Sequence, residues 1–280
     1  MTRFMAGALL LLLVASPLPA QTGTLDDPPP LLQIFREEVK VGRGGPHTAT
    51  EAGWPRAFAK AGIKNYYFAM TTVYGPQEAW FFEGHGSMAE IQEVNQAIEH
   101  SGLNKELDRL ALADAANISS ATTILAHYHP ELSNSRVDLA TIRIWEVLVF
   151  RCRPGHENDF MEAAKLYKTT VEQNKIDLRW ATYGVMAGMA SPTFLVFIPH
   201  ADLSGLDPAS PTSVALEKAF TEESGKRLSA LAEGYASTEE LVFLVSPEMS
   251  HLSPEFIARD PKFWGKKVAV AKPQAAKPAQ

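Results

Sequence analysis

The stretch HYHPELS at residues 127–133 returns 117 residues later as LVSPEMS at residues 244–250. Both contain Pro-Glu-(Leu/Met)-Ser, and each closes an apolar run, 123–126 in the first case and 241–244 in the second. A similarity that recurs at a fixed spacing is the sequence signature of a repeated structural unit. These stretches therefore predict that the chain holds two copies of one unit, related by an internal duplication.

Further pairs of segments match in the same order along the chain, with small changes of offset that insertions in loops explain. They are 35–41 with 144–150 at an offset of 109, 80–82 with 194–196 at an offset of 114, and the Gly/Pro turns that lead to His47 and His156. One such match would arise by chance, whereas several in one order favour duplication.

Each copy is expected to run strand, helix, strand, strand, helix, strand, because apolar residues alternate in some segments and recur at helical spacing in others. The expected segments are 35–41, 50–61, 65–73, 78–83, 88–114 and 122–128 in the first copy, and 143–151, 158–173, 178–187, 193–198, 213–236 and 238–245 in the second. This order is the ferredoxin-like arrangement, in which we expect strands 1 and 3 to be adjacent and parallel. Helices cover one face of such a sheet, and the other face needs a partner. We therefore expect an α+β protein in which two tandem ferredoxin-like βαββαβ units pack their antiparallel sheets together as an intramolecular α+β barrel.

One segment connects the chain to a known family. The stretch VFRCRPGHENDF at residues 149–160 resembles the strand, Pro-Gly turn and helix entry of NIPSNAP-like and antibiotic-biosynthesis-monooxygenase-like members of the dimeric α+β barrel superfamily. The pattern extends from Leu31 to about Ser250. The resemblance implies a fold more than an activity, because the superfamily contains cofactor-free oxygenases, haem-dependent enzymes, isomerases and ligand binders.

The N-terminal residues predict where the protein is located. Arg3 precedes an apolar run at 6–15 and small residues up to Ala20, which is typical of a cleavable signal peptide and shorter than the roughly 20 residues of a membrane span. We therefore expect a periplasmic or secreted protein with no membrane contact after cleavage. The expected divisions are a signal peptide at 1–20, a flexible tail at 21–30, a first repeat at 31–136, a second repeat with a C-terminal arm at 137–265, and a disordered tail at 266–280.

The composition excludes some classes of function. Hydrophobic residues are 46% and charged residues 21% of the chain, as in ordinary globular proteins, and a net charge of -6 argues against a nucleic-acid partner. Cys152 is the only cysteine, so the chain has no internal disulfide, and its place at the end of an apolar strand favours a buried structural residue. The aromatic segment within 247–264 is expected to pack on the core, with a docking arm as the alternative. The chain is expected to be a monomer or a homodimer.

Histidines follow strands 1 and 3 of each copy. If these strands are parallel neighbours, His47 and His85 meet at one edge of the first sheet, and His156 and His200 meet at one edge of the second. Imidazole binds metals and transfers protons, so His47 and His85 are candidate metal ligands. His156 and His200 are candidate cofactor ligands, by position alone. Solvated loop or helix-cap residues are the alternative for all four.

Two further pairs are catalytic candidates. His127 and His129 alternate along a strand and share one face, where they suit a metal or a proton transfer if that face is enclosed. Glu37 and Glu146 match across the repeats, each beside apolar neighbours that would raise its pKa and make it a candidate base. The alternatives are an exposed or cleft-lining polar face for the histidines and an ion pair with an arginine such as Arg36 or Arg143 for a glutamate.

Aromatic residues give the remaining clue. Tyr66, Phe68, Trp145, Trp180 and Tyr183 lie on expected strands, where most aromatic residues belong to the core. If some of them line the space between the sheets instead, that space suits a small, flat, apolar ligand. The first hypothesis is therefore an exported protein that binds such a ligand without catalysis. The alternative is an enzyme, an oxygenase or haem-dependent oxidoreductase of the dimeric α+β barrel type. No motif demands a cofactor, and haem and a metal ion both stay open.

Overall fold

The chain forms two halves, and each half has four strands and an outer layer of helices. The structure is a computed structural model that describes residues 26–265. The elements of the first half are β1 (Leu31–Val39), α1 (Gly44–Glu51), α2 (Gly53–Ala61), β2 (Tyr67–Tyr74), β3 (Glu78–His85), α3 (Met88–His100), α4 (Asn104–Asp114) and β4 (Ile118–Tyr128). Those of the second half are β5 (Ile144–Cys152), α5 (Glu157–Gln173), β6 (Ala181–Ala187), β7 (Thr193–His200), α6 (Pro211–Ala219), α7 (Glu222–Ala232) and β8 (Tyr235–Val245), followed by α8 (Pro254–Arg259) and α9 (Pro261–Trp264). The expected signal peptide and C-terminal tail lie outside the described residues.

Local sequence explains several helix boundaries. Ser87 caps α3 by accepting a hydrogen bond from the backbone N–H of Glu90 at 3.2 Å, while the Glu90 carboxylate accepts one from the backbone N–H of Gly86 at 2.7 Å. This exchange satisfies amide groups that a helix leaves unpaired at its first turn. At the other end of a helix, α2 stops at Gly62, whose φ of 70° is a conformation that glycine adopts without strain.

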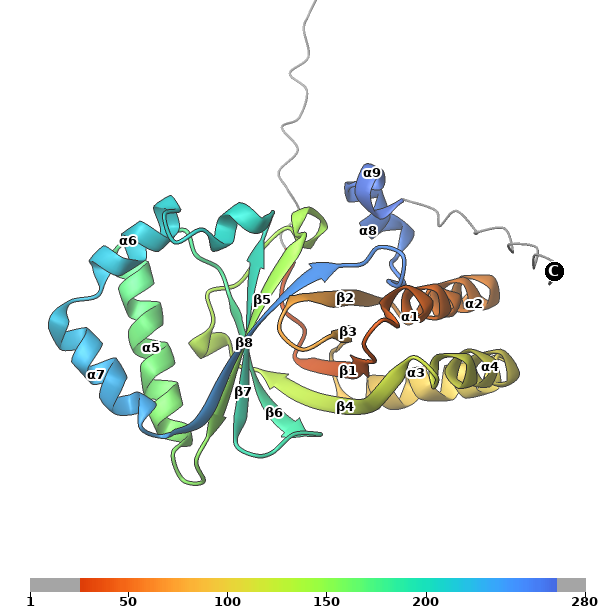
Figure 1. The fold of residues 1–280 in the computed structure, drawn as a ribbon, viewed down its shortest axis with the longest axis horizontal. Coiled ribbons are helices and arrows are strands. Elements are labelled where there is room, and N and C mark those ends of the chain that lie inside the picture. The colour runs from red at the N-terminus through yellow and green to blue at the C-terminus, as the bar shows by residue number, and fades with distance from the viewer. Residues whose placement is uncertain (1–25, 266–280) are drawn as a thin grey trace, which may run out of the picture.

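All eight strands form one closed barrel in the order β1-β3-β2-β8-β5-β7-β6-β4. Within each half the strands are neighbours, and the β2–β8 and β4–β6 pairs join the halves. Helices α1 to α4 cover the outside of the first half and α5 to α7 that of the second (Figure 1). The expected α+β barrel is thus confirmed, and one chain closes it without a partner. No helix within residues 26–265 has the length and hydropathy needed to cross a bilayer.

The direction of the strands corrects one expectation. β1 runs antiparallel to β3, with Leu31 opposite His85, and β5 runs antiparallel to β7, with Ile144 opposite His200. The expected parallel pairing was wrong. The helices after β1 bring the chain back so that β2 runs in the same direction as β1. The hairpin from β2 to β3 then reverses the direction, so β3 is antiparallel to β1. The two neighbours in the sheet therefore end at opposite ends of the barrel.

The pairing register also shows which strand residues of the two halves correspond. Leu31 and Ile144 hold the same place relative to the hairpin that follows, so β1 and β5 correspond at an offset of 113 residues. The β-bulges at Glu38–Val39 and Arg151–Cys152 have the same offset. The sequence match at 109 placed these strands four residues out of register.

The other strands show how sensitive such a match is. β4 and β8 correspond at an offset of 117, as the sequence predicted, because His127 and Leu244 stand opposite Leu31 and Ile144. β3 and β7 correspond at 115 rather than 114, with His85 matching His200. An error of one residue exchanges the two faces of a strand, so a sequence match at 114 pairs residues that face opposite sides of the sheet.

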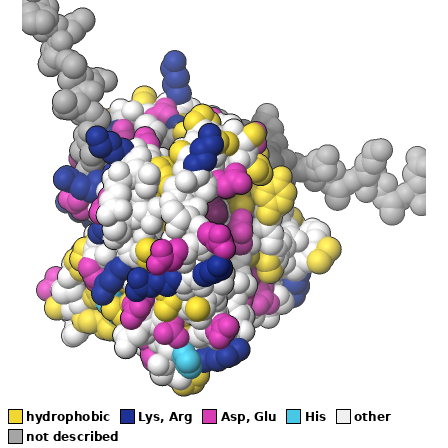
Figure 2. Space-filling view, turned by 90° about the vertical axis from the view of Figure 1, so that its left-hand side faces the viewer, with side chains coloured by type: hydrophobic (Ala, Val, Ile, Leu, Met, Phe, Trp, Pro, Cys, Tyr) yellow, Lys and Arg dark blue, Asp and Glu magenta, His cyan; other side chains and the backbone are white. Residues whose placement is uncertain are grey.

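The helical face of the second half is mixed in charge. Figure 2, which views the molecule from this side, shows Lys and Arg side chains interspersed with Asp and Glu. Arg227 of α7 and Glu162 of α5 form an ion pair at 3.3 Å on this layer. A nucleic-acid-binding surface instead gathers basic residues on one face, so this face gives no support to a nucleic-acid partner.

Candidate functional site

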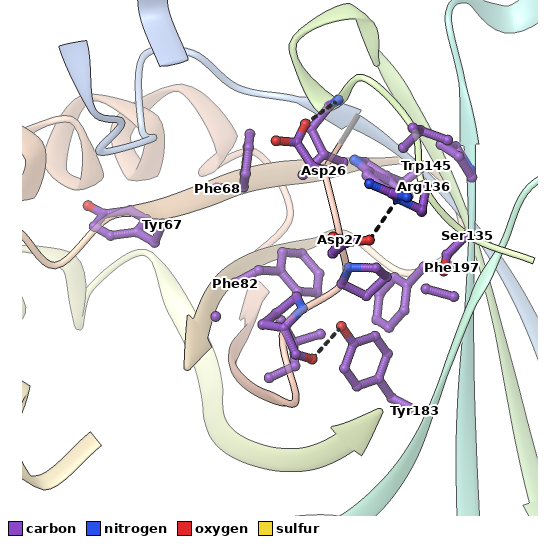
Figure 3. Close-up of a pocket in the computed structure, with 18 of the residues that line it drawn as sticks. Asp26, Asp27, Tyr67, Phe68, Phe82, Ser135, Arg136, Trp145, Tyr183 and Phe197 are labelled. Atoms are coloured by element: carbon purple, nitrogen blue, oxygen red, sulfur yellow. Dashed lines mark hydrogen bonds and ion pairs between the residues drawn. The ribbon is translucent and has the colours of Figure 1, made fainter. Parts of the chain in front are cut away.

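An apolar cavity opens at the end of the barrel where β1, β2, β5 and β6 begin and where β3, β7 and β8 end. Its volume is about 410 Å³. The lining includes the five aromatic residues that the sequence singled out, Tyr66, Phe68, Trp145, Trp180 and Tyr183. Figure 3 shows Phe68, Trp145 and Tyr183 among the residues around the cavity. These five residues therefore border a space at one end of the barrel, and two of them, Trp180 and Tyr183, are also buried core residues.

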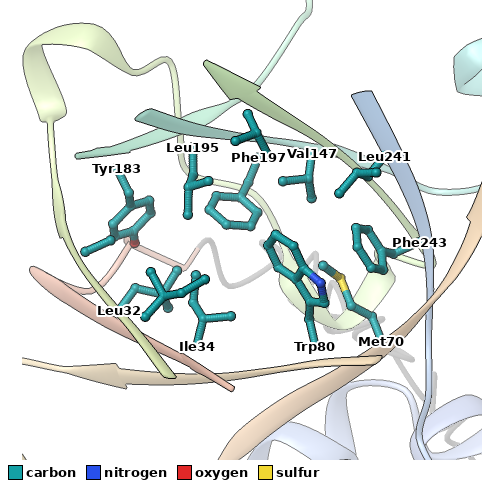
Figure 4. Packing of buried hydrophobic residues seen from close by; sticks show 13 residues of the cluster. Leu32, Ile34, Met70, Trp80, Val147, Tyr183, Leu195, Phe197, Leu241 and Phe243 are labelled. Carbon is teal, nitrogen blue, oxygen red and sulfur yellow. The ribbon is translucent and has the colours of Figure 1, made fainter. Parts of the chain in front are cut away.

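The floor of the cavity consists of aromatic rings in edge-to-face contact. The ring centroid of Phe197 lies 5.5 Å from that of Phe82, 5.9 Å from that of Tyr183 and 6.4 Å from that of Trp145. Below this floor, a cluster of apolar side chains from all eight strands fills the interior (Figure 4). The barrel is thus packed in its middle, with the apolar cavity at this end and a smaller polar hollow of about 200 Å³ around Arg36 and Arg151 at the other.

Residues 26–30 cross the mouth of the cavity, although the sequence assigned them to a flexible tail. The backbone N–H of Asp26 donates to the carbonyl of Val137 at 2.8 Å. The Tyr183 hydroxyl donates to the carbonyl of Pro29 at 3.1 Å. These bonds to distant parts of the chain hold the segment as one wall of the cavity, which the local sequence could not reveal.

The C-terminal arm forms another wall. Phe256 of α8 lines the cavity and packs against Phe68 of β2, with 5.1 Å between the ring centroids. Trp264 of α9 is 4% exposed, and its indole N–H donates to the carbonyl of Ala140 at 2.9 Å. The expectation that the arm packs back on the core is confirmed.

Two of the charged residues that line the cavity, Asp27 and Arg136, lie at its rim. Asp27 and Arg136 form an ion pair at 2.8 Å in which both side chains are more than half exposed. Burial raises the pKa of Tyr183 and of Tyr67 well above the usual range, so both hydroxyls stay neutral. The cavity therefore offers an aromatic surface with few polar groups.

The strand-end histidines do not meet in pairs. His85 stands opposite Leu31 at the beginning of β1, whereas His47 follows the end of that strand, so the two lie toward opposite ends of the barrel. His200 and His156 are separated in the same way about β5. The expected pairs were wrong because they rested on parallel strands.

Each of these histidines has its own surroundings. His85 is buried, its two ring nitrogens have no hydrogen-bond partner, and its Nε2 lies 3.6 Å from a carboxylate oxygen of Glu83. The other three pair with carboxylates, His47 with Asp114 at 3.0 Å, His156 with Asp159 at 2.7 Å and His200 with Glu146 at 3.1 Å.

A haem held by His156 or His200 does not fit this arrangement. Neither residue lines the cavity, and no histidine is among the residues of 26–265 that do. His156 is half exposed at the beginning of α5, and His200 is engaged by Glu146 outside the barrel interior. The cavity therefore lacks the axial histidine that the sequence offered for it.

His127 and His129 lie together on the outer face of the barrel, as the alternation predicted. Their ring centroids are 4.2 Å apart, and both rings stand over Gly184, where a Cβ would come within 3.0 Å of each. His129 Nδ1 lies 2.8 Å from the carboxylate of Glu131. Partial burial and the neighbouring His129 lower the pKa of His127. The pair does not reach the cavity.

Glu37 and Glu146 have different partners. Glu146 pairs with His200 at 3.1 Å, whereas a carboxylate oxygen of Glu37 lies 3.7 Å from His47 Nε2. Glu37 faces the helices beside Phe35 and Val39, as predicted, while Arg36 points inward and binds Glu78 at 2.6 Å. The ion pair with Arg36 is thus absent for Glu37. Burial raises the pKa of Glu37 to about 7, partly opposed by His47.

Glu37 and His47, which the sequence chose separately, belong to one cluster with two residues that it missed. Glu37, His47, Glu51 and Asp114 each offer one ligand atom, and these atoms lie within 4.8 Å of one another. Burial, helped by the carboxylates of Glu37 and Asp114, raises the pKa of Glu51 to about 9. The spacing of His47 and Glu51 on one helical face was a readable signal, whereas Asp114 lies 67 residues from His47 in the chain.

Comparisons with known proteins show the fold and no more. No protein-family model and no curated protein matches this chain. Its structure is similar to that of an anthrone oxidase-like protein, with a TM-score of 0.50 and 8% identity over 77% of this chain and 91% of that chain. A candidate monooxygenase from Lactobacillus acidophilus NCFM, with 8% identity over 77% of this chain and 93% of that chain, reaches a TM-score of 0.48, which carries no inference here. The fold shared with the anthrone oxidase-like protein is thus a closed α+β barrel.

Proposed function

We propose that the protein binds a small, flat, predominantly apolar molecule in the cavity at the end of its barrel. The observation that carries this proposal is a cavity of about 410 Å³ lined mainly by aromatic side chains. Binding sites for small molecules typically have volumes of about 300–1,000 Å³ and linings of this kind. The function is binding without catalysis.

The shape of the site indicates how such a ligand would lie. Its rings rest on the floor formed by Phe82, Phe197 and Trp145, where edge-to-face contacts with other aromatic rings are favourable. A polar group, if the ligand carries one, faces Asp27 and Arg136 at the rim. A molecule that is charged over its whole length would lose its hydration on this floor without compensation.

Native mass spectrometry of the protein purified from its own host without detergent tests this proposal. We expect a bound molecule of fixed mass that is lost under denaturing conditions. A titration of the recombinant protein with the fluorescent probe 1-anilinonaphthalene-8-sulfonate is expected to give saturable enhancement with one site.

Two substitutions of alanine by phenylalanine distinguish probe binding in the cavity from probe binding to other apolar surfaces. Ala181 lines the cavity, so Ala181→Phe is expected to fill it and to weaken probe binding at least tenfold. Ala111 is exposed on α4, and Ala111→Phe is the control that should leave binding unchanged. Equal probe binding by the two variants would show that the probe binds elsewhere.

The enzyme alternative, an oxygenase or haem-dependent oxidoreductase, is supported by the fold only. Catalysis in the cavity needs a group that transfers a proton or holds a cofactor close to the substrate. Among the described lining residues, each charged group has a partner, and the hydroxyls of Tyr67 and Tyr183 stay protonated; the pairs are Asp27 with Arg136, Asp26 with Arg259 and Arg179 with Asp177. Ligand binding without catalysis is therefore the function that this lining favours.

We also propose that the protein is exported and that its halves are tandem ferredoxin-like repeats. The basic start and short apolar run before Ala20 support export, and N-terminal sequencing of protein from the periplasm or medium should begin at Gln21. A chain that keeps residues 1–20 would contradict this. The common strand order of the halves and the shared positions of their bulges support duplication.

A further inference from the structure

We propose that Glu37, His47 and Glu51 bind one divalent first-row transition-metal ion, and that Asp114 orients His47 for this purpose. The four residues lie between the outer face of β1 and helices α1 and α4 of the first half. None of them lines the apolar cavity. The site is therefore separate from the proposed ligand site and is tested independently of it.

His47 is held in the orientation that a metal ligand needs. It is 1% exposed, and its Nδ1 lies 3.1 and 3.0 Å from the two carboxylate oxygens of Asp114. With the Nδ1 hydrogen donated to this carboxylate, Nε2 carries a free lone pair. Histidines that bind metals usually have such a carboxylate behind them. Asp114 is itself fixed by the amide of Asn117, which donates to it at 2.9 Å.

The free ring nitrogen points into the cluster and has no partner. His47 Nε2 makes no hydrogen bond, and the nearest carboxylate oxygen, Glu37 Oε2 at 3.7 Å, is also buried without one. Buried polar atoms are nearly always satisfied by protein, water or an ion. Two orphaned ligand atoms that face each other are what a bound cation between them would explain.

The cluster also gathers more acidic side chains than nearby basic groups offset. Glu37, Glu51 and Asp114 bring three carboxylates to one histidine. Within residues 26–265, no ion pair joins a lysine or arginine to any of the three carboxylates, and Arg43 donates to the amide oxygen of Asn117 instead. Buried charges need a partner of opposite sign, and a divalent cation supplies it.

At the equivalent location in the second half, the residues that correspond to the three proposed ligands are apolar. The counterparts of the three proposed ligands, 113 residues later, are Phe150, Phe160 and Ala164. Phe150 and Phe160 are in contact, with 5.1 Å between their ring centroids, and all three belong to the apolar cluster beneath α5. The fold therefore needs no polar side chain here, and the first half has ligand atoms where its counterpart has an apolar contact.

The donor set indicates the class of ion. One imidazole nitrogen with two carboxylates suits Mn²⁺, Fe²⁺ or Zn²⁺, whereas Mg²⁺ and Ca²⁺ prefer oxygen ligands alone. Ligands about 2.0–2.2 Å from one ion lie at most about 4.4 Å apart, so small side-chain rotations would close a cluster spanning 4.8 Å. The Glu37 side chain is 18% exposed and gives the ion access from solvent.

Metal content of the untagged protein tests the proposal. Protein stripped with a chelator is dialysed against Mn²⁺, Zn²⁺, anaerobic Fe²⁺ or Mg²⁺, and bound metal is measured by plasma mass spectrometry. We expect about one transition-metal ion per chain, no stoichiometric Mg²⁺, and a higher melting temperature with the bound ion. The signal of free Mn²⁺ in electron paramagnetic resonance should fall by one equivalent.

Variants then assign the site. His47→Ala and Glu51→Gln should each abolish stoichiometric binding, and Asp114→Asn should weaken it by about 10–100-fold, as loss of an orienting partner does. The matched controls are His156→Ala and Glu146→Gln in the second half, which should bind metal normally. Circular dichroism verifies that each variant is folded.

Several results would overturn the proposal. They are absence of bound metal at saturating concentration, unchanged binding by folded His47→Ala or Glu51→Gln, and loss of binding in the second-half controls. Equal binding of Mg²⁺ would overturn the class of ion. If the buried variants fail to fold, Glu37→Gln at the partly exposed edge is the substitute, and normal metal binding by this variant would likewise contradict the site.

Discussion

Replacing Trp264 by alanine is expected to release the C-terminal arm from the barrel. Trp264 is 4% exposed and packs its ring against Phe68 at 5.8 Å and Phe256 at 5.4 Å between centroids. Its indole N–H donates to the carbonyl of Ala140 at 2.9 Å. This one side chain therefore connects the arm to β2 and to the segment between the halves.

The size of the effect follows from this burial. A buried tryptophan removes about 150–250 Å² from water, which at about 25 cal/mol per Å² amounts to about 4–6 kcal/mol. Core Trp→Ala substitutions cost about 3–5 kcal/mol, so we expect a loss of about 4 kcal/mol. The helices α8 and α9 have six and four residues and no stability of their own. The arm should therefore open locally while the barrel stays folded.

Limited proteolysis with trypsin measures this opening. Cleavage after Arg259 should be at least tenfold faster in Trp264→Ala than in the unmodified protein, while the main unfolding transition persists. Probe binding should weaken, because Phe256 leaves the wall of the cavity. Lys262→Ala, which changes an exposed residue of the same arm, is the control. Unchanged cleavage in the tryptophan variant, or loss of the whole fold, would refute the reasoning.

Burial raises the pKa of the Cys152 thiol to about 11; since the thiolate is the reactive form, a thiol reagent at pH 8 should label the folded protein at least tenfold more slowly than a cysteine peptide, and rapid labelling would contradict this. Glu78 accepts a hydrogen bond from Arg36 inside the barrel at 2.6 Å. Glu78→Gln should therefore lower the free energy of unfolding by about 3 kcal/mol in a urea titration, because loss of one partner strands a buried charge; a change below about 1 kcal/mol would show that water already screens the pair. His127 should titrate by NMR below the usual pKa of 6.5, because burial and His129 lower its pKa, and His129→Gln should raise that pKa; a midpoint indifferent to the substitution would exclude coupling of the two rings.

The sequence located the elements closely because hydrophobic periodicity is a local property. The strand expected at 78–83 is β3 at Glu78–His85, and the helix expected at 158–173 is α5 at Glu157–Gln173. The helical segment expected at 88–114 is α3 and α4, which Ser101 and Gly102 separate. Each depends on side-chain spacing or turn residues within a few positions of the chain.

Only part of the proposed metal site could be predicted from the sequence, because some of its residues are far apart in the chain. Glu37 stood out because it interrupts an apolar strand face, and His47 because it follows a turn. Nothing local connects them to Asp114, which reaches His47 because α4 packs beside α1. The sequence also paired His47 with His85, which lie apart because β1 and β3 are antiparallel. The local pattern of residues does not reveal the relative direction of two strands.

The sequence by itself determined that this is an α+β protein, since the periodicity of strands and helices is carried by consecutive residues, and it predicted an internal duplication. It also singled out five aromatic residues that border the cavity. Only the tertiary structure decided the register between the halves, the antiparallel neighbours in the barrel and the contacts that hold residues 26–30 and the arm over the cavity. The physical reason is that pairing and packing join residues far apart in the chain, where a shift of one residue turns a side chain from the interior to the helical layer.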